Sequence, residues 1–577
     1  MSLIPRETFH QRLYFVYGFI LIMVAVITYR LVNLQIANHS TWERMAENQY
    51  VGVLPDVIDR GSIYFTTHDG ERVTAATIQR GYKVFLNPSV IGDIDEIVAG
   101  LKQVVPGLDE ERIRSRAERT NDTYEEVIWR LSKEDAELIR DLGIDGINLA
   151  ADQWRQYPSK QLASHVVGFV GYNEGVLSGR YGLEKSYQST LLRSPNKQVV
   201  NFFAQVYSDE KEIRESDVSY EEGDIITSIE PQAQTFLDTQ VMSIQETWSS
   251  EKTGALIIHP KTGQVISLST SDRFDLNDLS DTTNDQLANP FVERVYEMGS
   301  IIKPLIFAMA LEEKVITPTT PFYDSGSVKV GRYTISNFDK RGRGQITMTE
   351  VLQQSLNTGM VWISQHLSRT VMKDYLYALG LGEKTGIDLP YEIKSLTSNL
   401  DSGREVEYSN VSFGQGIALT PIATVRALSA LANHGQLTQP HVVTEIDKTQ
   451  GGVIKIDQEE GEQIFSEKTV EEVTRMLVGL VDESFKDKYP ALEGYSVAAK
   501  TGTAQIANPQ GGYYDDRNLH SFFGYFPAYE PEFLVFFYTV HPRGVRFSSE
   551  TLSDPFMRTA QFLVEYYNIP PDRIVVE

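Results

Sequence analysis

Apolar residues are densest near the N-terminus of the chain. The run Leu13–Tyr29 carries no formal charge and has basic residues on both sides. An apolar helix of this length lies at the short end for crossing a bilayer, and flanking residues can extend it. The pattern predicts a single transmembrane helix over residues 13–36, with a cytoplasmic tail over 1–12 and the bulk of the chain outside the cytoplasm. A cleaved signal peptide is the alternative, although no A-x-A-like cleavage site follows the run.

Residues 37–224 mix short strand-like runs with charged segments, which predicts a domain separate from the rest. Tyr82–Pro88 has the character of a strand, and the charged stretch 125–143 has the character of a helix. The acidic stretch Ser208–Asp224 predicts a solvated connector or hairpin arm. A chain of 577 residues has room for two or three such domains.

A second unit begins at residue 225. Residues 224–248 predict a strand, a turn at Pro231 and a long amphipathic helix, and residues 254–270 predict a β-hairpin. The segment 290–440 is mainly helical in character, and strand-like runs return towards the C-terminus before a closing helix. This order predicts an α+β fold over residues 225–577, with an antiparallel sheet flanked by helices.

Composition excludes several classes of function. The net charge is −25, from 53 basic and 78 acidic residues, which argues against a protein that binds nucleic acid through a positive surface. The chain has no cysteine, which excludes disulfides, thiolate zinc sites and a cysteine nucleophile. It is 41% hydrophobic and 23% charged, as in an ordinary globular protein.

The first candidate for chemistry is the pair Ser300 and Lys303, one helical turn apart at the start of the apolar stretch Ile301–Leu311. Burial in such a stretch lowers the pKa of a lysine, and a neutral amine can take the proton of a serine hydroxyl. The helix start also favours developing negative charge at the serine. The spacing alone is weak evidence, because Ser-x-x-Lys also begins at Ser194, Ser208 and Ser249.

Two further motifs follow along the chain. Ser355 and Asn357 end a helix-like segment in which Thr347 and Glu350 have the spacing of a capping box. Lys-Thr-Gly occurs four times, and only the copy at Lys500 lies in a strand-like run. A cation, hydroxyls and a glycine on a strand edge can bind a peptide backbone and its carboxylate at close range.

Ser300, Ser355 and Lys500 occur in the order found in penicillin-binding proteins and class A β-lactamases. Over nearly its whole length the sequence resembles the class B penicillin-binding proteins, which are monofunctional peptidoglycan D,D-transpeptidases. Met298, Ile301 and Ile302 depart from the residues that this family commonly has beside its active serine, without removing a catalytic group. Five longer stretches carry the resemblance: 59–64, 164–192, 253–270, 412–437 and 521–527.

The resemblance implies a penicillin-binding transpeptidase domain on an elongated N-terminal pedestal, and a role for each site residue. Ser300 is the expected nucleophile and Lys303 its general base. Ser355 relays a proton towards the leaving amine with Lys500 nearby, and Asn357 binds the substrate amide. The strand motif is expected to bind the terminal carboxylate of the substrate; it consists of Lys500, Thr501, Gly502 and Thr503. The backbone N–H groups of Ser300 and Thr503 are expected to form the oxyanion hole, and no metal or cofactor is needed.

The resemblance also implies partners and a location. The expected substrates are peptidoglycan stem peptides that end in D-Ala-D-Ala, which β-lactams mimic. The expected location is the cytoplasmic membrane, with a polytopic glycan polymerase and other wall-synthesis proteins as partners and no nucleic acid. The sequence and spacing of the pedestal segment favour a transpeptidase of the septal, cell-division type. The alternatives are an elongation-type transpeptidase, a β-lactamase or β-lactam sensor, and a catalytically silent scaffold.

Overall fold

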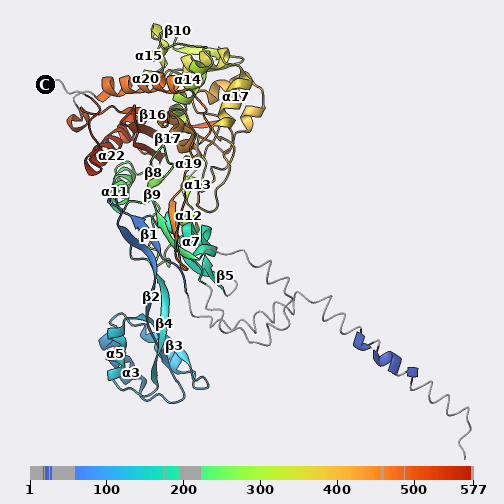
Figure 1. The fold of residues 1–577 in the computed structure, drawn as a ribbon, viewed down its shortest axis with the longest axis vertical. Coiled ribbons are helices and arrows are strands. Elements are labelled where there is room, and N and C mark those ends of the chain that lie inside the picture. Colours follow the sequence, from blue (N-terminus) through green and yellow to red (C-terminus); the bar gives the residue numbers. More distant parts are fainter. Residues whose placement is uncertain are drawn as a thin grey trace, which may run out of the picture.

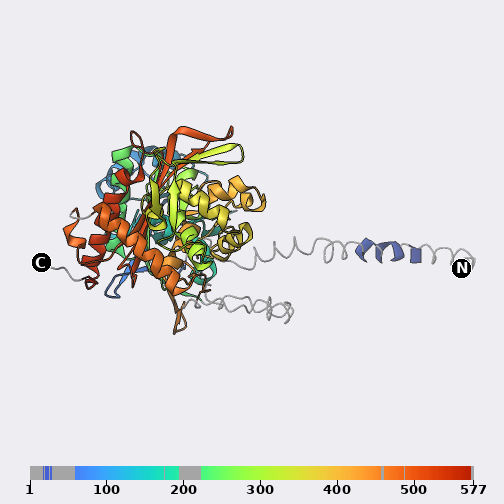
Figure 2. The ribbon, with the colours of Figure 1, turned by 90° about the horizontal axis from the view of Figure 1, so that it is seen from above.

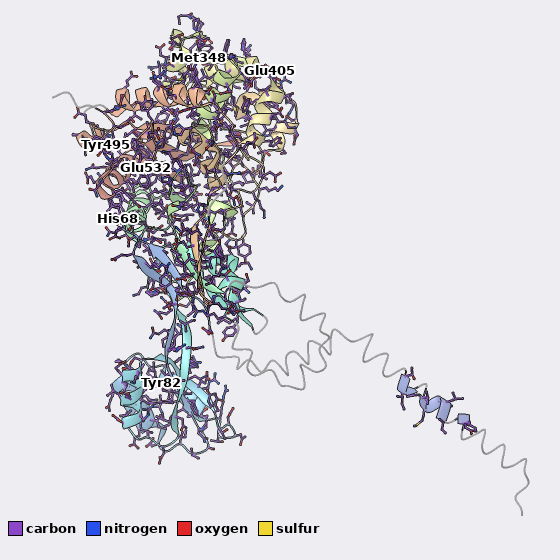
Figure 3. All side chains as sticks on the ribbon, viewed as in Figure 1. His68, Tyr82, Met348, Glu405, Tyr495 and Glu532 are labelled. Atoms are coloured by element: carbon purple, nitrogen blue, oxygen red, sulfur yellow. The ribbon has the colours of Figure 1, made fainter. Side chains whose placement is uncertain are left out.

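The structure is a computed structural model, and it describes residues 17–18, 20–24, 26–28, 59–173, 176–193, 222–456, 461–485 and 488–573. Figure 1 shows a small head at the end of two long strands and a larger body at their other end. Figure 3 places Tyr82 in the head, and Met348 and Glu405 at the far end of the body. The molecule is therefore elongated, as the resemblance implied.

The head is built on the two long antiparallel strands, β2 (Arg72–Leu86) and β4 (Ile147–Gln156). Their distal halves pack with β3 and three helices around a small apolar core. The side chains of Asp93, Asp109 and Ser132 cap the starts of the three helices, and each accepts a backbone N–H of the first turn. The other elements of the head are α3 (Ile94–Val104), α4 (Glu110–Ala117), β3 (Glu125–Leu131) and α5 (Lys133–Asp141).

The prediction of a helix over residues 125–143 is only partly correct. Its first part is β3, which pairs with β2, and the helix α5 starts after Ser132. Val127 and Leu131 bury their side chains on the core face of β3. Pairing with a neighbouring strand thus decides the conformation of this charged segment, and the serine cap fixes where the helix begins.

A mixed sheet joins the pedestal to the body. The strand β1 (Ile63–Thr66) pairs with β2 on one side and runs parallel to β7 (Gly223–Thr227) on the other. β7 in turn pairs with β14 (Val443–Lys448), which pairs with β15 (Val453–Lys455). The predicted domain boundary between residues 224 and 225 falls inside β7. The two units therefore share one sheet.

The body is organised by a five-stranded antiparallel sheet, in agreement with the predicted architecture. Its strand order is β16-β17-β18-β8-β9. The predicted hairpin forms β8 and β9, and Pro231 is the first residue of α11 rather than a turn before it. The strands and the helix are β8 (Lys252–Ile258), β9 (Val265–Thr270), β16 (Ala498–Ala507), β17 (Tyr513–Phe526), β18 (Phe533–Val540) and α11 (Pro231–Trp248).

Side chains alternate between the two faces of this sheet, as the period of a strand requires. Ala255 and Ile257 face α11 and α22 (Ser553–Tyr566), while Leu256 and Ile258 belong to the larger core around α14 (Lys303–Glu312). Figure 2 shows helices packed around the sheet. The helix α14 is therefore buried between the sheet and the helical part of the body, where its apolar sequence belongs.

The predicted helical middle of the chain is confirmed. It contains the helices α12 (Asn284–Leu287), α13 (Pro290–Glu293), α14, α15 (Met348–Gln353), α16 (Asn357–His366), α17 (Arg369–Ala378), α18 (Glu405–Val411) and α19 (Pro421–Ser429). Two small antiparallel strand pairs interrupt it, the hairpin of β11 (Ser327–Val330) with β12 (Tyr333–Ser336) and, enclosing it in the chain, the pair of β10 (Pro321–Asp324) with β13 (Gly344–Thr347). The other elements are α6 (Ser164–Val167), β5 (Val170–Asn173), β6 (Val176–Gly179), α7 (Gly182–Ser186), α8 (Gln188–Leu191), α20 (Glu467–Phe485) and α21 (Ser548–Thr551).

Two predicted features fall largely outside the described residues. Only 17–18, 20–24 and 26–28 of the expected membrane anchor are described, and they are helical. In the described part of the chain we find no helix with the length and apolar character that a membrane span needs. Of the expected acidic connector, residues 208–221 lie outside the described residues.

Candidate active site

Ser300 lies in a 3-10 turn, Gly299–Ile302, that leads directly into α14. Its neighbours Ile301 and Ile302 are fully buried, and Ser300 itself is half-buried. Gly299 has φ +65°, and a Cβ at this position would lie 2.9 Å from the carbonyl oxygen of Thr503. A glycine is needed here, because only a residue without a side chain lets the strand approach so closely in this backbone conformation.

Lys303 is the first residue of α14 and is completely buried. Its Nζ lies 2.7 Å from the carbonyl oxygen of Ser355, 2.9 Å from Asn357 Oδ1 and 3.2 Å from Ser355 Oγ. Burial holds the pKa of Lys303 well below its ordinary value, and the nearby positive charge of Lys500 lowers it further. Both causes favour the neutral form of the amine over its charged form.

A neutral amine has two hydrogens and one lone pair. The two shorter contacts, to the Ser355 carbonyl and to Asn357 Oδ1, use both hydrogens. In the third contact, the charged amine donates to Ser355 Oγ, whereas the neutral amine has only its lone pair left and can accept the Ser355 hydroxyl. This arrangement connects Lys303 and Ser355 by a bond along which a proton can move.

Ser355 and Asn357 are placed by the junction between α15 and α16. The capping box expected from Thr347 and Glu350 is present at the start of α15. Ser355 has φ +55°, a backbone conformation that residues other than glycine rarely adopt. In this conformation its carbonyl faces Lys303. Asn357 opens α16, and its Nδ2 donates to the carbonyl of Ser336 on β12 at 3.1 Å.

Lys500 lies on β16 and is 1% exposed. Burial lowers its pKa to about 7. Its Nζ donates to the carbonyl of Thr501 at 3.1 Å. At neutral pH this lysine is close to the point at which it gains or loses its charge.

The strand β16 packs directly against the turn that carries Ser300. A Cβ on Gly502 would lie 2.2 Å from Ser521 Oγ and 2.7 Å from the carbonyl oxygen of Met298. The Ser521 hydroxyl donates to that same Met298 carbonyl at 2.7 Å. Thr501 and Thr503 are half-buried at this edge of the sheet, and Thr503 Oγ1 accepts the backbone N–H of Ser548 at 3.2 Å.

The structure thus brings the predicted residues together in two groups. Lys303, Ser355 and Asn357 are in direct contact, and the strand motif of Lys500 to Thr503 packs against the turn of Ser300. Among the described residues the Ser300 hydroxyl has no hydrogen-bond partner. Catalytic hydrogen bonds are often absent or long before substrate binds, so this geometry is compatible with a nucleophile.

Sequence reasoning missed several residues that support the site. Ser521 and Ser548 hold the serine turn and Thr503, and a buried group around Asp324 lies behind Asn357. Ser521 begins one of the stretches that carry the resemblance, and the others belong to no motif. The only signal in the sequence is their position in segments adjacent to the motifs, which does not distinguish them from other polar residues.

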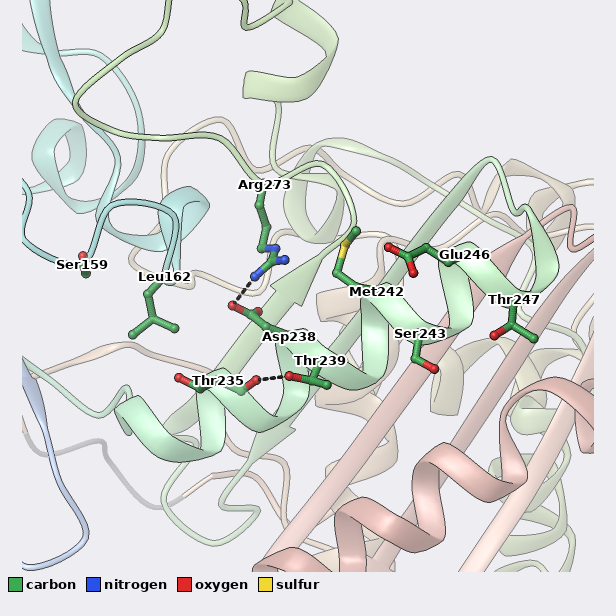
Figure 4. Close-up of a pocket in the computed structure, with 10 residues that line it drawn as sticks. All are labelled: Ser159, Leu162, Thr235, Asp238, Thr239, Met242, Ser243, Glu246, Thr247 and Arg273. Atoms are coloured by element: carbon green, nitrogen blue, oxygen red, sulfur yellow. Dashed lines mark hydrogen bonds and ion pairs between the residues drawn. The ribbon is translucent and has the colours of Figure 1, made fainter.

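A separate groove of about 550 Å³ lies on α11, away from these residues (Figure 4). Arg273 donates to Asp238 at 3.0 Å at its base, and Ser159 and Leu162 of the pedestal form part of its wall. None of the predicted site residues lines it. Hydroxyl-bearing side chains of α11 form much of its surface.

Comparison with known families matches both parts of the chain. Residues 253–560 match the penicillin binding protein transpeptidase domain, and residues 57–224 match the penicillin-binding protein dimerisation domain. The first match contains all the predicted site residues. The second covers the head and the strands that connect it to the body.

Similar proteins cover most of the chain. Stage V sporulation protein D of Bacillus subtilis is 29% identical over 564 residues, which are 96% of this chain and 85% of that protein. The peptidoglycan D,D-transpeptidase FtsI of Escherichia coli is 26% identical, over 76% of this chain and 72% of that protein. The crystal structure of penicillin binding protein 2X from Streptococcus thermophilus has a TM-score of 0.71 at 20% identity, covering 89% of this chain and 80% of that one, and shares the fold.

Proposed function

Because the chain belongs to the penicillin-binding protein transpeptidase family, of class B, we propose that Ser300 is the residue through which it cross-links peptidoglycan stem peptides. The observation that carries this proposal is the fully buried Lys303, whose amine contacts Ser355 and Asn357 beside the turn of Ser300. A buried, neutral lysine next to a reachable serine supplies the base that serine acylation needs.

In the proposed first step, Ser300 Oγ attacks the carbonyl between the two terminal D-alanines of a donor stem. Lys303 accepts the hydroxyl proton as the new C–O bond forms. The proton passes through Ser355 to the nitrogen of the leaving D-alanine as the C–N bond breaks. Asn357 binds the amide of the donor stem, and an ester on Ser300 remains.

The strand β16 serves the other end of the donor. Lys500 in its protonated form, together with the hydroxyls of Thr501 and Thr503, binds the terminal carboxylate. The backbone N–H groups of Ser300 and Thr503 stabilise the oxyanion, which is worth a few kcal/mol in such sites. In the second step, the amine of an acceptor stem attacks the ester and releases Ser300, and a cross-link results.

The setting of this reaction is also part of the proposal. We propose that residues 13–36 anchor the protein in the cytoplasmic membrane as a single pass, with the body outside the cytoplasm. The apolar run Leu13–Tyr29 supports the anchor. A polytopic glycan polymerase is the proposed partner. The division septum is the proposed site of action, which the sequence and spacing of the pedestal segment favour.

Covalent labelling tests the chemistry. Purified protein should form a stable adduct with a fluorescent penicillin, and Ser300→Ala should form none. Ser249→Ala is the matched control, because Ser249 and Lys252 have the same Ser-x-x-Lys spacing outside the site. Labelling that survives in Ser300→Ala would refute the assignment, and steady hydrolysis of the penicillin would instead indicate a β-lactamase.

Depletion in cells tests the setting. If the protein acts at the septum, depleted cells should grow into filaments and a fluorescent fusion should gather at mid-cell. Round cells with a dispersed fusion would indicate an elongation role. A cell that divides normally with only a Ser300→Ala allele would favour a silent scaffold.

A further inference from the structure

A buried carboxylate lies behind Asn357. Asp324, the last residue of β10, is 1% exposed. Its oxygens accept the backbone N–H groups of Gly326 and Arg343, each at 2.9 Å, and the hydroxyl of Thr358 at 2.7 Å. The side chain of Asn337 donates to both oxygens, at 3.0 and 2.9 Å. Hydrogen-bond donors thus stabilise this carboxylate without a basic side chain among its described partners.

Asn337 links this carboxylate to the start of α16. It is 2% exposed, and its Oδ1 accepts the backbone N–H of Thr358 at 3.2 Å. Thr358 is 3% exposed and is the second residue of α16, directly after Asn357. We call Asp324, Asn337 and Thr358 the Asp324 cluster. It joins three segments that are separate in the chain: β10, the end of β12 and α16.

The same cluster fixes the carbonyl that receives Asn357. Ser336 precedes Asn337, and its carbonyl accepts Nδ2 of Asn357 at 3.1 Å. On its other side, Asn357 presents Oδ1 to Lys303 Nζ at 2.9 Å. The two ends of a carboxamide differ, since one accepts and the other donates. The Ser336 carbonyl therefore decides which end of Asn357 meets the lysine.

A shift of this carbonyl would release the amide. If Asn357 turned over, its NH2 group would face Lys303 and its oxygen would face the Ser336 oxygen. Lys303 would lose an acceptor, and its remaining contacts would both be to Ser355. The lone pair of the amine would no longer be held in one direction. Misplacement of this size at a general base lowers the rate of proton transfer steeply.

We infer that the Asp324 cluster is a positioning element for the acylation step, because it holds Asn357 with its oxygen on Lys303. The cluster touches no reacting atom and acts through Asn357 and Ser336. The inference rests on the proposed function of Lys303 as the base of Ser300. It adds Asp324, Asn337 and Thr358 to the residues that the reaction depends on.

The test uses the rate of acylation by a fluorescent penicillin between pH 5.5 and 9.5. Thr358→Val keeps the shape of the side chain and removes the donor to Asp324, so the second-order rate constant should fall about tenfold. In this variant Lys303 would lose Asn357 Oδ1 as an acceptor, which favours the neutral form of its amine. The acid limb of the plot of acylation rate against pH should therefore move to lower pH. Lys500 is the charged group that acts on Lys303, and this variant leaves it in place. Thr358→Ser, which keeps the hydroxyl, should have the wild-type rate and the wild-type position of the acid limb.

Asp339→Asn is the matched control. Asp339 lies in the same loop as Asn337 and pairs with the side chain of Arg343 near the surface, without touching α16. It should acylate like the wild type. Asp324→Asn should repeat the effect of Thr358→Val, because its new NH2 group would face the donors that now surround the carboxylate.

The outcomes separate the positioning role of the Asp324 cluster from the proposed function of Ser300 and Lys303. If Thr358→Val lowers the melting temperature but keeps the rate and pH profile of the wild type, the cluster is only structural and the inference fails. If the rate falls and Thr358→Ser does not restore it, the hydroxyl is not the cause and the inference also fails. If the wild type itself forms no adduct, the proposed function fails instead. Should Asp324→Asn not fold, Thr358→Val and Thr358→Ser still decide.

Discussion

The buried amine of Lys303 sets the expected pH dependence of the reaction. Its pKa lies well below the ordinary value, and only the neutral form can accept the proton of Ser300. The acylation rate should therefore rise with pH on the acid side as the amine loses its proton. Lys303→Arg should abolish acylation at every pH, because a guanidinium stays protonated. Stopped-flow labelling across the pH range measures both, and acylation by Lys303→Arg at even a tenth of the wild-type rate would contradict a base role.

The second buried lysine of the candidate site, Lys500, should lower the stability of the fold. Its pKa is about 7 in the folded protein and ordinary in the unfolded chain, so the unfolded state binds more protons between about pH 7 and 10.5. The free energy of unfolding should then rise with pH across this window. Lys500→Met should be more stable than the wild type near pH 7, by about 4 kcal/mol, with a gain that disappears towards pH 10.5. The same variant should lose acylation, because the carboxylate loses its cation.

Thermal melts of both proteins at several pH values measure this effect. Lys314→Met is a suitable control, because Lys314 is exposed and no change of the same size should follow. An equal gain in stability at pH 7 and pH 10.5 would show that packing of the methionine, rather than removal of the charge, is responsible.

At this scale the sequence points to candidate site residues but not to the residues that support them. Ser300, Lys303 and Lys500 occur in motifs whose order along the chain is informative, and the structure places their segments together. Asp324 and Ser548 cannot be found in this way. Their role depends on contacts with Thr358 and Thr503, which are distant in the chain and meet only in the fold.

At the scale of elements, the contact between β16 and the serine turn is the critical one. A methyl group on Gly502 would collide with Ser521 Oγ and with the backbone oxygen of Met298. Gly502→Ala should push the strand away from the turn and lower the acylation rate at least about a hundredfold, since a shift of about 1 Å has such an effect. Gly107→Ala is the control, because nothing lies within 4 Å of the added Cβ.

Rates of penicillin labelling and circular dichroism together distinguish the two possible causes. Gly502→Ala should keep the helix and strand content of the wild type while its rate falls. A variant that labels at the wild-type rate would mean that the turn and the strand can separate without cost to the site.

The elements themselves were predicted best where one principle dominates. The apolar pattern of β8 and β9 favours a hairpin, and the continuous apolar sequence of α14 favours a buried helix. Both elements are present as predicted. The segment that forms β3 carries charges at helical spacing, and its pairing with β2 overrides that local preference. The 3-10 turn at Ser300 was likewise not expected, since it depends on the approach of β16.

For the whole molecule, the sheet that joins the pedestal to the body suggests that the two unfold together. β1 of the pedestal pairs with β7, and β7 pairs with β14 of the body. Beside this junction lies Glu184, which is fully buried between Arg60 at 2.5 Å and Arg155 at 2.6 Å. Arg155 lies on β4 and also donates to the carbonyl of Gly61 at 2.7 Å, which holds β4 against the start of β1.

Glu184→Gln should therefore destabilise the entire protein. The change keeps the shape of the side chain but leaves two buried guanidinium groups without their counter-charge, a loss of about 3–5 kcal/mol. If the shared sheet couples the two units, the melting transition and the temperature at which penicillin labelling is lost should fall together. Arg72→Ala is the control, because Arg72 makes an ion pair with Asp447 across the same junction at the surface, where such pairs contribute little. Labelling that persists to the wild-type temperature in Glu184→Gln would mean that the body folds independently of the pedestal, and that the shared strands are not enough to make the two units one cooperative structure.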